Sequence, residues 1–276
     1  MLEPEVQILL STFNGASFLE AQIESLLSQS FQNWQLLIRD DGSTDQTLTI
    51  INSYKEAHPK KVVIIKNENG GSSTKSFMSL LNSVSAPYIM FCDQDDVWLP
   101  AKIENSLTAL KRIEKKHPVS AVYCDMRVVN SELETISPSF LKSQSLNPIW
   151  CAKPYSVFAQ SMAAGCSMIF TKTLADRLHP IDSLLFQHDH WILMHAANYG
   201  KIGFLDNILI NYRQHADNAI GSHKIGMSYF GKKVKTTRLV WTRWKYIKSQ
   251  YQPSPSIIKI AIEKVRINLL RLLGRQ

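Results

Sequence analysis

Apolar runs and helical stretches alternate along the N-terminal part of the chain. Four apolar runs of strand length are separated by segments whose apolar residues recur at helical spacing. The strands predicted from these runs are Val6–Leu10, Trp34–Arg39, Val62–Lys66 and Ala86–Phe91. This alternation favours an α/β fold with a mostly parallel sheet flanked by helices on both faces. Because crossovers between parallel strands are right-handed, we expect the loops that follow the strands along one edge of the sheet.

The second half of the chain has a less regular pattern. Further strands are predicted at Ala121–Cys124 and Ala163–Phe170, and two short ones at Lys201–Leu205 and Ile208–Tyr212. The segment Asp125–Lys153 is enriched in Ser, Asn and Pro and predicts a long loop, which in a compact domain is usually functional or mobile. The small residues that begin the second of these strands would let a ligand approach the backbone closely.

Polar residues follow three of the predicted parallel strands. They are Asn14-Gly15, Asp40-Asp41 and the acidic stretch Asp93–Asp96. Open α/β sheets bind ligands at the carboxyl ends of their strands. Clustered carboxylates repel one another unless a cation or hydrogen-bond donors neutralise them, and Mg²⁺ or Mn²⁺ suits such oxygen ligands. The acidic stretch therefore predicts a divalent cation that holds a diphosphate. The alternative is a solvated acidic turn before the next helix, but the convergence of three polar clusters on one edge favours the metal.

Two other stretches carry candidate chemistry. Asp189 lies between two histidines at the start of a predicted helix and could act as a general base, since a carboxylate in a partly dry pocket can take a proton from a hydroxyl group. The alternative is a helix cap, with Trp191 in the core. Arg213 and His215 lie two residues apart on a predicted strand, so they point to the same side, where they could meet a diphosphate and a metal. For His215 the alternative is an ordinary surface or core histidine.

The positive charge of the chain is concentrated in its C-terminal segment. From Ser222 to Gln276 there are 13 Lys and Arg and one acid, a net charge of +12, whereas the whole chain carries +8. The apolar residues of this segment are interleaved with basic ones, which is typical of a helix at an anionic membrane surface. The alternative is a helical hairpin packed on the body of the protein or on another subunit.

The body has no recognisable nucleic-acid module, and the chain shows neither a signal peptide nor a transmembrane run. Its four cysteines are expected to be reduced and packed in a cytosolic protein.

Four stretches, taken in order, resemble the family 2 glycosyltransferases, which have the GT-A (Rossmann-like) fold. They are Ser11–Gly15, Asp40–Asp45, Asp93–Asp96 and His188–Trp191. The resemblance implies an inverting, metal-dependent glycosyltransferase that uses a nucleotide-diphosphate sugar and Mg²⁺ or Mn²⁺. The implied roles are catalytic base for Asp189, donor binding for Ser11, Thr12, Asn14, Asp41, Asp93 and Arg213, and metal ligation for Asp93, Asp95 and His215.

A finer resemblance bears on the donor sugar. Asp93–Trp98 with Tyr212–His215 and Asn218 is most similar to the bacterial rhamnosyltransferase branch. This implies transfer of L-rhamnose from dTDP-rhamnose to a saccharide or lipid-linked saccharide in cell-surface polysaccharide synthesis. The alternatives are a UDP-hexose donor on the same fold, or a non-catalytic subunit that binds a sugar nucleotide or a membrane.

The expected organisation is a glycosyltransferase domain over 1–221 and a basic amphipathic helical extension over 222–276. We expect a cytoplasmic protein that lies peripherally on the inner face of the cell membrane through this extension and that binds no nucleic acid. The oligomeric state is open, with a homo-oligomer among the options.

Overall fold

The predicted strand–helix units are present in the computed structural model, which describes residues 3–66, 71–178, 180–215, 237–252 and 254–273. The elements of the N-terminal half are β1 (Val6–Thr12), α1 (Ala16–Leu27), β2 (Trp34–Asp40), α2 (Thr47–Ala57), β3 (Val62–Ile64), α3 (Ser73–Leu81), β4 (Tyr88–Cys92), β5 (Val97–Trp98) and α4 (Lys102–Glu114). Those of the C-terminal half are β6 (Ser120–Val129), β7 (Thr135–Ser137), α5 (Phe140–Ser143), η1 (Pro148–Ala152), α6 (Pro154–Ala159), η2 (Gly165–Ser167), β8 (Met168–Thr171), α7 (Lys172–Ala175), α8 (His188–Tyr199), β9 (Lys201–Arg213), α10 (Thr237–Gln250) and α11 (Ile257–Leu272).

The strands of the described residues form one sheet in the order β3-β2-β1-β4-β8-β6-β9-β5, and β7 pairs with β6 beside it. The sheet is parallel where the repeated units form it, from β3 to β4, and becomes mixed beyond β4 because β8 runs antiparallel to both of its neighbours. The register pairs Thr12 with Asp40 and Leu10 with Cys92. The polar residues that follow these three strands therefore lie side by side, as predicted.

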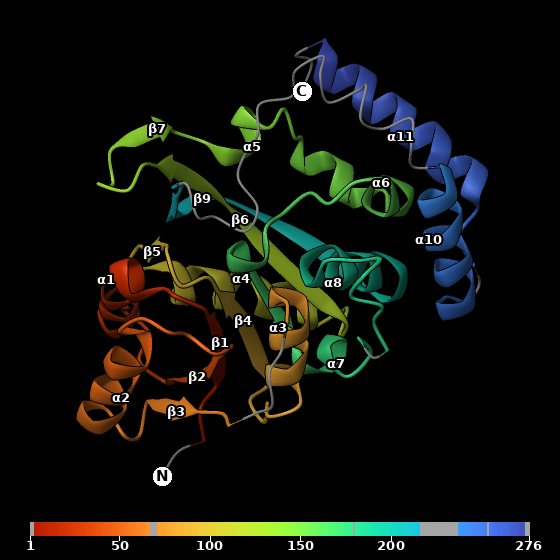
Figure 1. Ribbon diagram of the computed structural model, residues 1–276. Coiled ribbons are helices and arrows are strands. Elements are labelled where there is room, and N and C mark those ends of the chain that lie inside the picture. The colour runs from red at the N-terminus through yellow and green to blue at the C-terminus, as the bar shows by residue number, and fades with distance from the viewer. Residues whose placement is uncertain (1–2, 67–70, 179, 216–236, 253, 274–276) are drawn as a thin grey trace.

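Two apolar layers cover the sheet. Successive residues of a strand point to opposite faces, so Leu9 belongs to one buried cluster while Ile8 and Leu10 belong to the other. Burial on both faces explains why these strands read as continuous apolar runs. Helices cover both faces of the sheet (Figure 1). The four cysteines are buried and form no disulfide, as expected of packed, reduced thiols.

The second half departs from the prediction in two places. The loop predicted over Asp125–Lys153 is wrong for its first part, because β6 continues through Val129 and β7 returns beside it. Met126 and Val128 are buried and alternate with half-buried residues, so this part has the two-residue period of a strand despite its polar composition. The two short strands predicted after Tyr199 form a single strand, β9, whose pairing with β6 is irregular.

The C-terminal helices pack on the body. Tyr251 and Ile267 are fully buried in the same apolar cluster as Phe158 of α6 and Trp191 of α8. The Tyr251 ring lies 5.1 Å from that of Phe158, and its hydroxyl group is 2.8 Å from His195 Nδ1. In Figure 1, α11 lies beside α6 and α10 lies beside α8. The predicted domain boundary at residue 221 falls outside the described residues. No helix in the described parts of the chain is long and apolar enough to cross a bilayer.

Candidate active site

A cavity of about 690 Å³ opens at the edge where β1, β2 and β4 end. Six of the residues predicted from the sequence line it: Ser11, Thr12, Asp41, Asp93, Asp95 and Asp189. Asp189 comes from the start of α8, far from these strand ends in the sequence. The three other predicted residues, Asn14, Arg213 and His215, do not line the cavity, and each contacts a segment that does.

Asn14 joins the loop after β1 to the loop after β2. Its side-chain oxygen accepts a hydrogen bond from the Thr44 backbone N–H (2.8 Å), and its own N–H donates to Ser43 Oγ (2.8 Å). The residue has a φ of 47°, in the left-handed region that Asn tolerates better than most residues. Beneath it, Thr12 Oγ1 donates to Asp40 Oδ1 (2.8 Å). Asn14 and Thr12 therefore fix the shape of the two loops.

Gln94, which the sequence did not single out, connects the acidic stretch to the loop after β1. Its amide nitrogen donates to the Phe13 carbonyl (3.0 Å), and its amide oxygen accepts from the Phe13 N–H (2.9 Å). This pair of bonds mimics the pairing of two strands. Gly15 allows it, because a Cβ at that position would overlap the Gln94 amide. No local pattern reveals this contact, since its two ends lie 81 residues apart.

Asp41 is held in place at the end of β2. Its carboxylate lies 3.3 Å from Arg39 Nε, and it accepts a hydrogen bond from the Ser76 hydroxyl group of α3. Arg39 is buried, so this ion pair is little exposed to water. A carboxylate fixed in this way at the cavity wall can accept hydrogen bonds from hydroxyl or N–H groups of a ligand.

The acidic stretch has an outer and an inner part. Asp93 and Asp95 line the cavity, whereas Asp96 is fully buried below it and accepts a hydrogen bond from the Arg213 N–H (3.0 Å). Burial, together with the negative charge of Asp95, raises the pKa of Asp93 to about 7. Burial also raises the pKa of Asp96 well above its ordinary value. The acidic stretch therefore holds more carboxyl groups than its surroundings stabilise in the ionised form.

Arg213 and His215 support Asp95 from behind. Arg213 Nε donates to the Asp95 carbonyl oxygen (2.7 Å), and His215 Nε2 lies 2.9 Å from Asp95 Oδ2. The ring of Phe18 packs 4.5 Å from the His215 ring and 4.6 Å from the Arg213 guanidinium. Both predicted residues are therefore gathered at the acidic stretch, but the Arg213 side chain is directed at protein carbonyl groups rather than into the cavity.

Asp189 is the carboxylate that α8 contributes to the cavity lining. It lies in the first turn of α8, where a negative charge is favoured by the helix dipole, and its Oδ1 accepts from the His190 N–H (2.6 Å). Burial raises the pKa of Asp189 to about 6, which makes it a stronger base than an exposed aspartate. Trp191 is fully buried. Asp189 thus lies at a helix start, as the helix-cap interpretation expects, and in the cavity, as the general-base interpretation expects.

The two histidines beside Asp189 have different surroundings. His188 lines the cavity, where burial lowers its pKa to about 3, so its ring is neutral at pH 7. The ring of His190 points to α6, with Nε2 2.7 Å from the Val157 carbonyl oxygen. Burial lowers the pKa of His190 to about 4. Neither ring supplies positive charge to the site near neutral pH.

The carboxylates at the cavity wall fit a hard divalent cation. Ligand atoms of Asp93, Asp96 and Cys166 lie within 4.8 Å of one another, and one oxygen of Asp96 is buried with no hydrogen-bond partner among the described residues. Burial and the nearby acids raise the pKa of the Cys166 thiol well above its ordinary value, so it stays protonated. Mg²⁺ and Mn²⁺ prefer oxygen ligands, and Asp93 and Asp95 are the carboxylates of the acidic stretch that line the cavity.

The model of the family described as glycosyl transferase family 2 matches residues 7–172. An uncharacterized glycosyltransferase of Rickettsia prowazekii is 27% identical over 226 residues, which cover 77% of this chain and 65% of that protein. The chain thus spans slightly less than two thirds of the length of this relative. The dTDP-rhamnosyl transferase RfbG of Shigella flexneri is 25% identical over 248 residues, covering 85% of this chain and 80% of that protein.

A solved structure shares the fold over nearly the whole chain. It is the mannosyltransferase PcManGT of Pyrobaculum calidifontis in complex with GDP-Man and Mn²⁺, with a TM-score of 0.65 and 14% sequence identity. The similarity covers 99% of this chain and 72% of that one. At this level of identity, the likeness establishes the GT-A arrangement of strands and helices and nothing finer.

Proposed function

The chain belongs to glycosyl transferase family 2, and we propose that it transfers a sugar from a nucleotide-diphosphate sugar to a hydroxyl group, with inversion at the anomeric carbon. The observation that carries the proposal is the position of a half-buried carboxylate of raised pKa, Asp189, in the same cavity as the paired acids Asp93 and Asp95. A protein that only binds a sugar nucleotide has no use for such a base. This speaks against the non-catalytic alternative.

The donor would occupy the half of the cavity formed by the strand ends. Ser11, Thr12 and Asp41 are placed to bind the nucleoside, and Asp93 to bind its ribose. The proposed metal ligands are Asp93 and Asp95, with His215 holding Asp95 or completing the ligand set. When bound, the cation supplies positive charge against the diphosphate. Arg213 acts indirectly in this arrangement, because it fixes the backbone of Asp95.

The chemical step is a single displacement. The acceptor oxygen forms a bond to the anomeric carbon while the bond from that carbon to the diphosphate oxygen breaks. The leaving nucleoside diphosphate keeps the electron pair, and the proton of the acceptor hydroxyl passes to Asp189. Because Asp189 is ionised above about pH 6, it can accept this proton near neutral pH. No covalent enzyme intermediate is needed.

For the donor we propose dTDP-L-rhamnose, which the similarity to the Shigella flexneri transferase supports over 85% of the chain. A UDP-hexose is the alternative, because the residues that line the donor half of the cavity do not discriminate between the two. The acceptor is proposed to be a saccharide or lipid-linked saccharide of a cell-surface polysaccharide.

An anionic membrane surface is the proposed partner of the C-terminal helices. Ile258, Ile262, Val265, Leu269 and Leu272 form a stripe along α11 and are 53% to 68% exposed. Beside the stripe, Glu263 and Arg266 form an ion pair at 2.8 Å and offset each other, while Lys259 and Lys264 leave this side of the helix net positive. A second copy of the helix would therefore bring like charges together, whereas anionic lipid would be attracted. On α10, the rings of Trp241 and Trp244 lie 4.8 Å apart at a tilt of 32°, with Lys245 and Lys248 over them. Tryptophan and lysine are typical of membrane interfaces.

The test of the proposed function is a set of nucleotide sugars measured by thermal stabilisation with Mn²⁺, since a ligand that binds only the folded state raises its stability. We expect stabilisation by dTDP-rhamnose with Mn²⁺ and none with EDTA. A larger shift with a UDP-hexose would select the alternative donor. If no nucleotide sugar stabilises the protein, the proposed function is wrong.

A further inference from the structure

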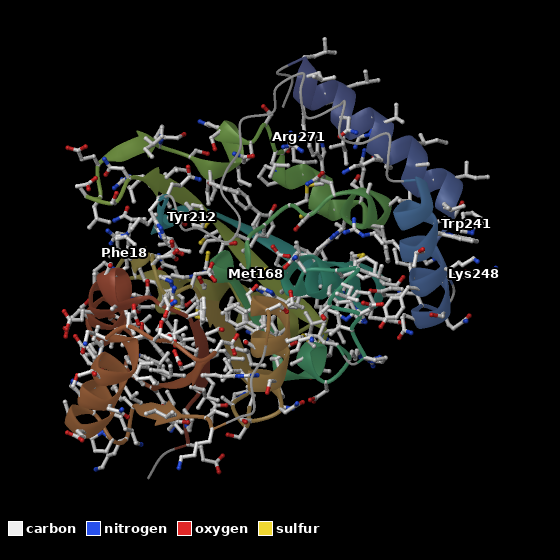
Figure 2. All side chains as sticks on the ribbon, viewed as in Figure 1. Phe18, Met168, Tyr212, Trp241, Lys248 and Arg271 are labelled. Atoms are coloured by element: carbon white, nitrogen blue, oxygen red, sulfur yellow. The ribbon has the colours of Figure 1, made fainter. Side chains whose placement is uncertain are left out.

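One cationic side chain reaches the cavity from the C-terminal helices. Arg271, in the last turn of α11, lines the cavity, and its Nε donates to the Gln144 carbonyl oxygen at 3.0 Å. Gln144 follows α5 and also lines the cavity. Figure 2 shows Arg271 on the side of α11 that faces α5 and α6. The guanidinium is therefore anchored at the wall formed by the second half of the chain.

The charge of the cavity makes this residue distinctive. Four carboxylates line it, those of Asp41, Asp93, Asp95 and Asp189. Among the described residues of the lining, Arg271 is the only one with a full positive charge at pH 7, because burial lowers the pKa of His188 to about 3. Arg271 comes from the wall formed by α5, α6 and α11, which lie away from α1 and α2 at the donor half (Figure 1).

The opposite side of α11 carries exposed apolar side chains next to Arg271 in the sequence. The exposed apolar stripe of α11 contains Leu269 and Leu272, which lie two residues before and one residue after Arg271 in the sequence. Ile267, in contrast, is fully buried against the body. One turn of helix thus presents apolar side chains outward and a guanidinium inward to the cavity. A ligand that carries a phosphate at the end of a hydrocarbon chain could contact the guanidinium and the apolar stripe at the same time.

We propose that Arg271 forms an anion-binding subsite for the acceptor and that the anion is the phosphate of a lipid-linked acceptor. This inference rests on the proposed function and adds the class of acceptor to it. A guanidinium recognises a phosphate through paired, charge-assisted hydrogen bonds. With the lipid at the α11 stripe and the phosphate at Arg271, the attached sugar extends into the cavity toward Asp189.

The experiment measures binding of geranyl diphosphate to the full chain by titration calorimetry, with Mn²⁺ and saturating UDP or dTDP to fill the donor half. We expect Arg271→Gln to weaken binding by roughly 10- to 100-fold, the range for lost hydrogen bonds to a charged group. Arg271→Lys should retain part of the affinity, since it keeps the charge. Gln can still donate to the Gln144 carbonyl group, so a purely structural role would make these two variants alike.

Arg266→Gln is the matched control. This residue lies on the same helix, pairs with Glu263 at 2.8 Å and does not line the cavity, so its variant should bind like the wild type. Geraniol and inorganic pyrophosphate separate the two parts of the probe. Tighter binding of geranyl diphosphate than of pyrophosphate supports a lipid-linked phosphate, while equal binding of the two overturns the lipid and leaves a simple phosphate.

Unchanged affinity of Arg271→Gln for geranyl diphosphate would overturn the subsite itself. The nucleotide titration reports on the proposed function separately. If UDP and dTDP both fail to bind wild-type protein with Mn²⁺, the proposed function fails. If one of them binds wild type and Arg271→Gln equally while the geranyl diphosphate result is negative, only the subsite fails.

Discussion

Replacing Asp189 by Asn tests the proposed chemical step most directly. The substitution keeps the size of the side chain, and an Asn oxygen can still accept the hydrogen bond that Asp189 receives from the His190 N–H at 2.6 Å. What is lost is the ability to take a proton. General-base catalysis contributes roughly 10²- to 10⁴-fold, which corresponds to about 3 to 5 kcal/mol of transition-state stabilisation. We therefore expect kcat to fall by a factor on the order of 10² or more.

The pKa of Asp189 supplies a second signature. Because burial raises this pKa to about 6, the ionised and active form is lost as the pH falls through 6. At pH 7.5 about 97% of the base is ionised and at pH 5 about 9%. Wild-type kcat, measured with saturating Mn²⁺ and donor so that Asp93 stays ionised, should therefore be about tenfold lower at pH 5. The residual activity of Asp189→Asn should lack this acidic limb.

The assay is transfer from the donor that best stabilises the protein, with donor affinity measured in parallel by calorimetry. Asp176→Asn is the control, since its carboxylate is 60% exposed and pairs with Lys172 outside the cavity. Donor affinity should be the same in all three proteins. Turnover of Asp189→Asn within a few fold of wild type, or an unchanged acidic limb, would refute Asp189 as the base.

Three further predictions concern the metal, the membrane and the fold. Asp95→Ala should weaken Mn²⁺-dependent donor binding by a factor on the order of 10 to 100, and EDTA should weaken donor binding to wild type in the same way. Donor binding that is unchanged by both would remove Asp95 from the metal site. Ile262→Glu with Leu269→Glu should lower binding to phosphatidylglycerol vesicles by about tenfold without changing the melting temperature, because both side chains are exposed; equal binding would exclude the α11 stripe as the contact. Gly200→Ala should lower stability by roughly 1 to 3 kcal/mol in urea unfolding, because a Cβ there would overlap the Val119 carbonyl oxygen; an unchanged midpoint would contradict this packing.

The donor half of the site could be predicted because its information is local. An apolar run predicts each strand of the first half, and the polar residues that line the cavity follow directly after these runs. Parallel pairing then brings the ends of β1, β2 and β4 together without further information. This is why Asp41 and Asp93 were found from the sequence and lie in one cavity.

The wall around the acceptor could not be predicted in the same way. Arg271 reads as one more base of an amphipathic helix, and its contact with Gln144 joins residues 127 positions apart. Likewise, the segment after Asp125 forms a strand although its polar composition predicts a loop. The structure also shows that deleting 222–276 would be a poor test of membrane binding. Since Tyr251 and Ile267 are buried in the body, it would expose the core, and surface substitutions are the cleaner experiment.

The support of Asp95 follows from an element too short to recognise in the sequence. β5 has two residues, and it pairs antiparallel with β9 so that Val97 faces Asn211. Continued by two residues, the same register sets Asp95 opposite Arg213, which is where their 2.7 Å hydrogen bond lies. His215 then follows just beyond, within reach of the Asp95 carboxylate. The place of the proposed metal ligand is thus set by a strand pairing between segments more than 100 residues apart in the sequence, and a shift of β9 by one residue would remove both of its supports at once.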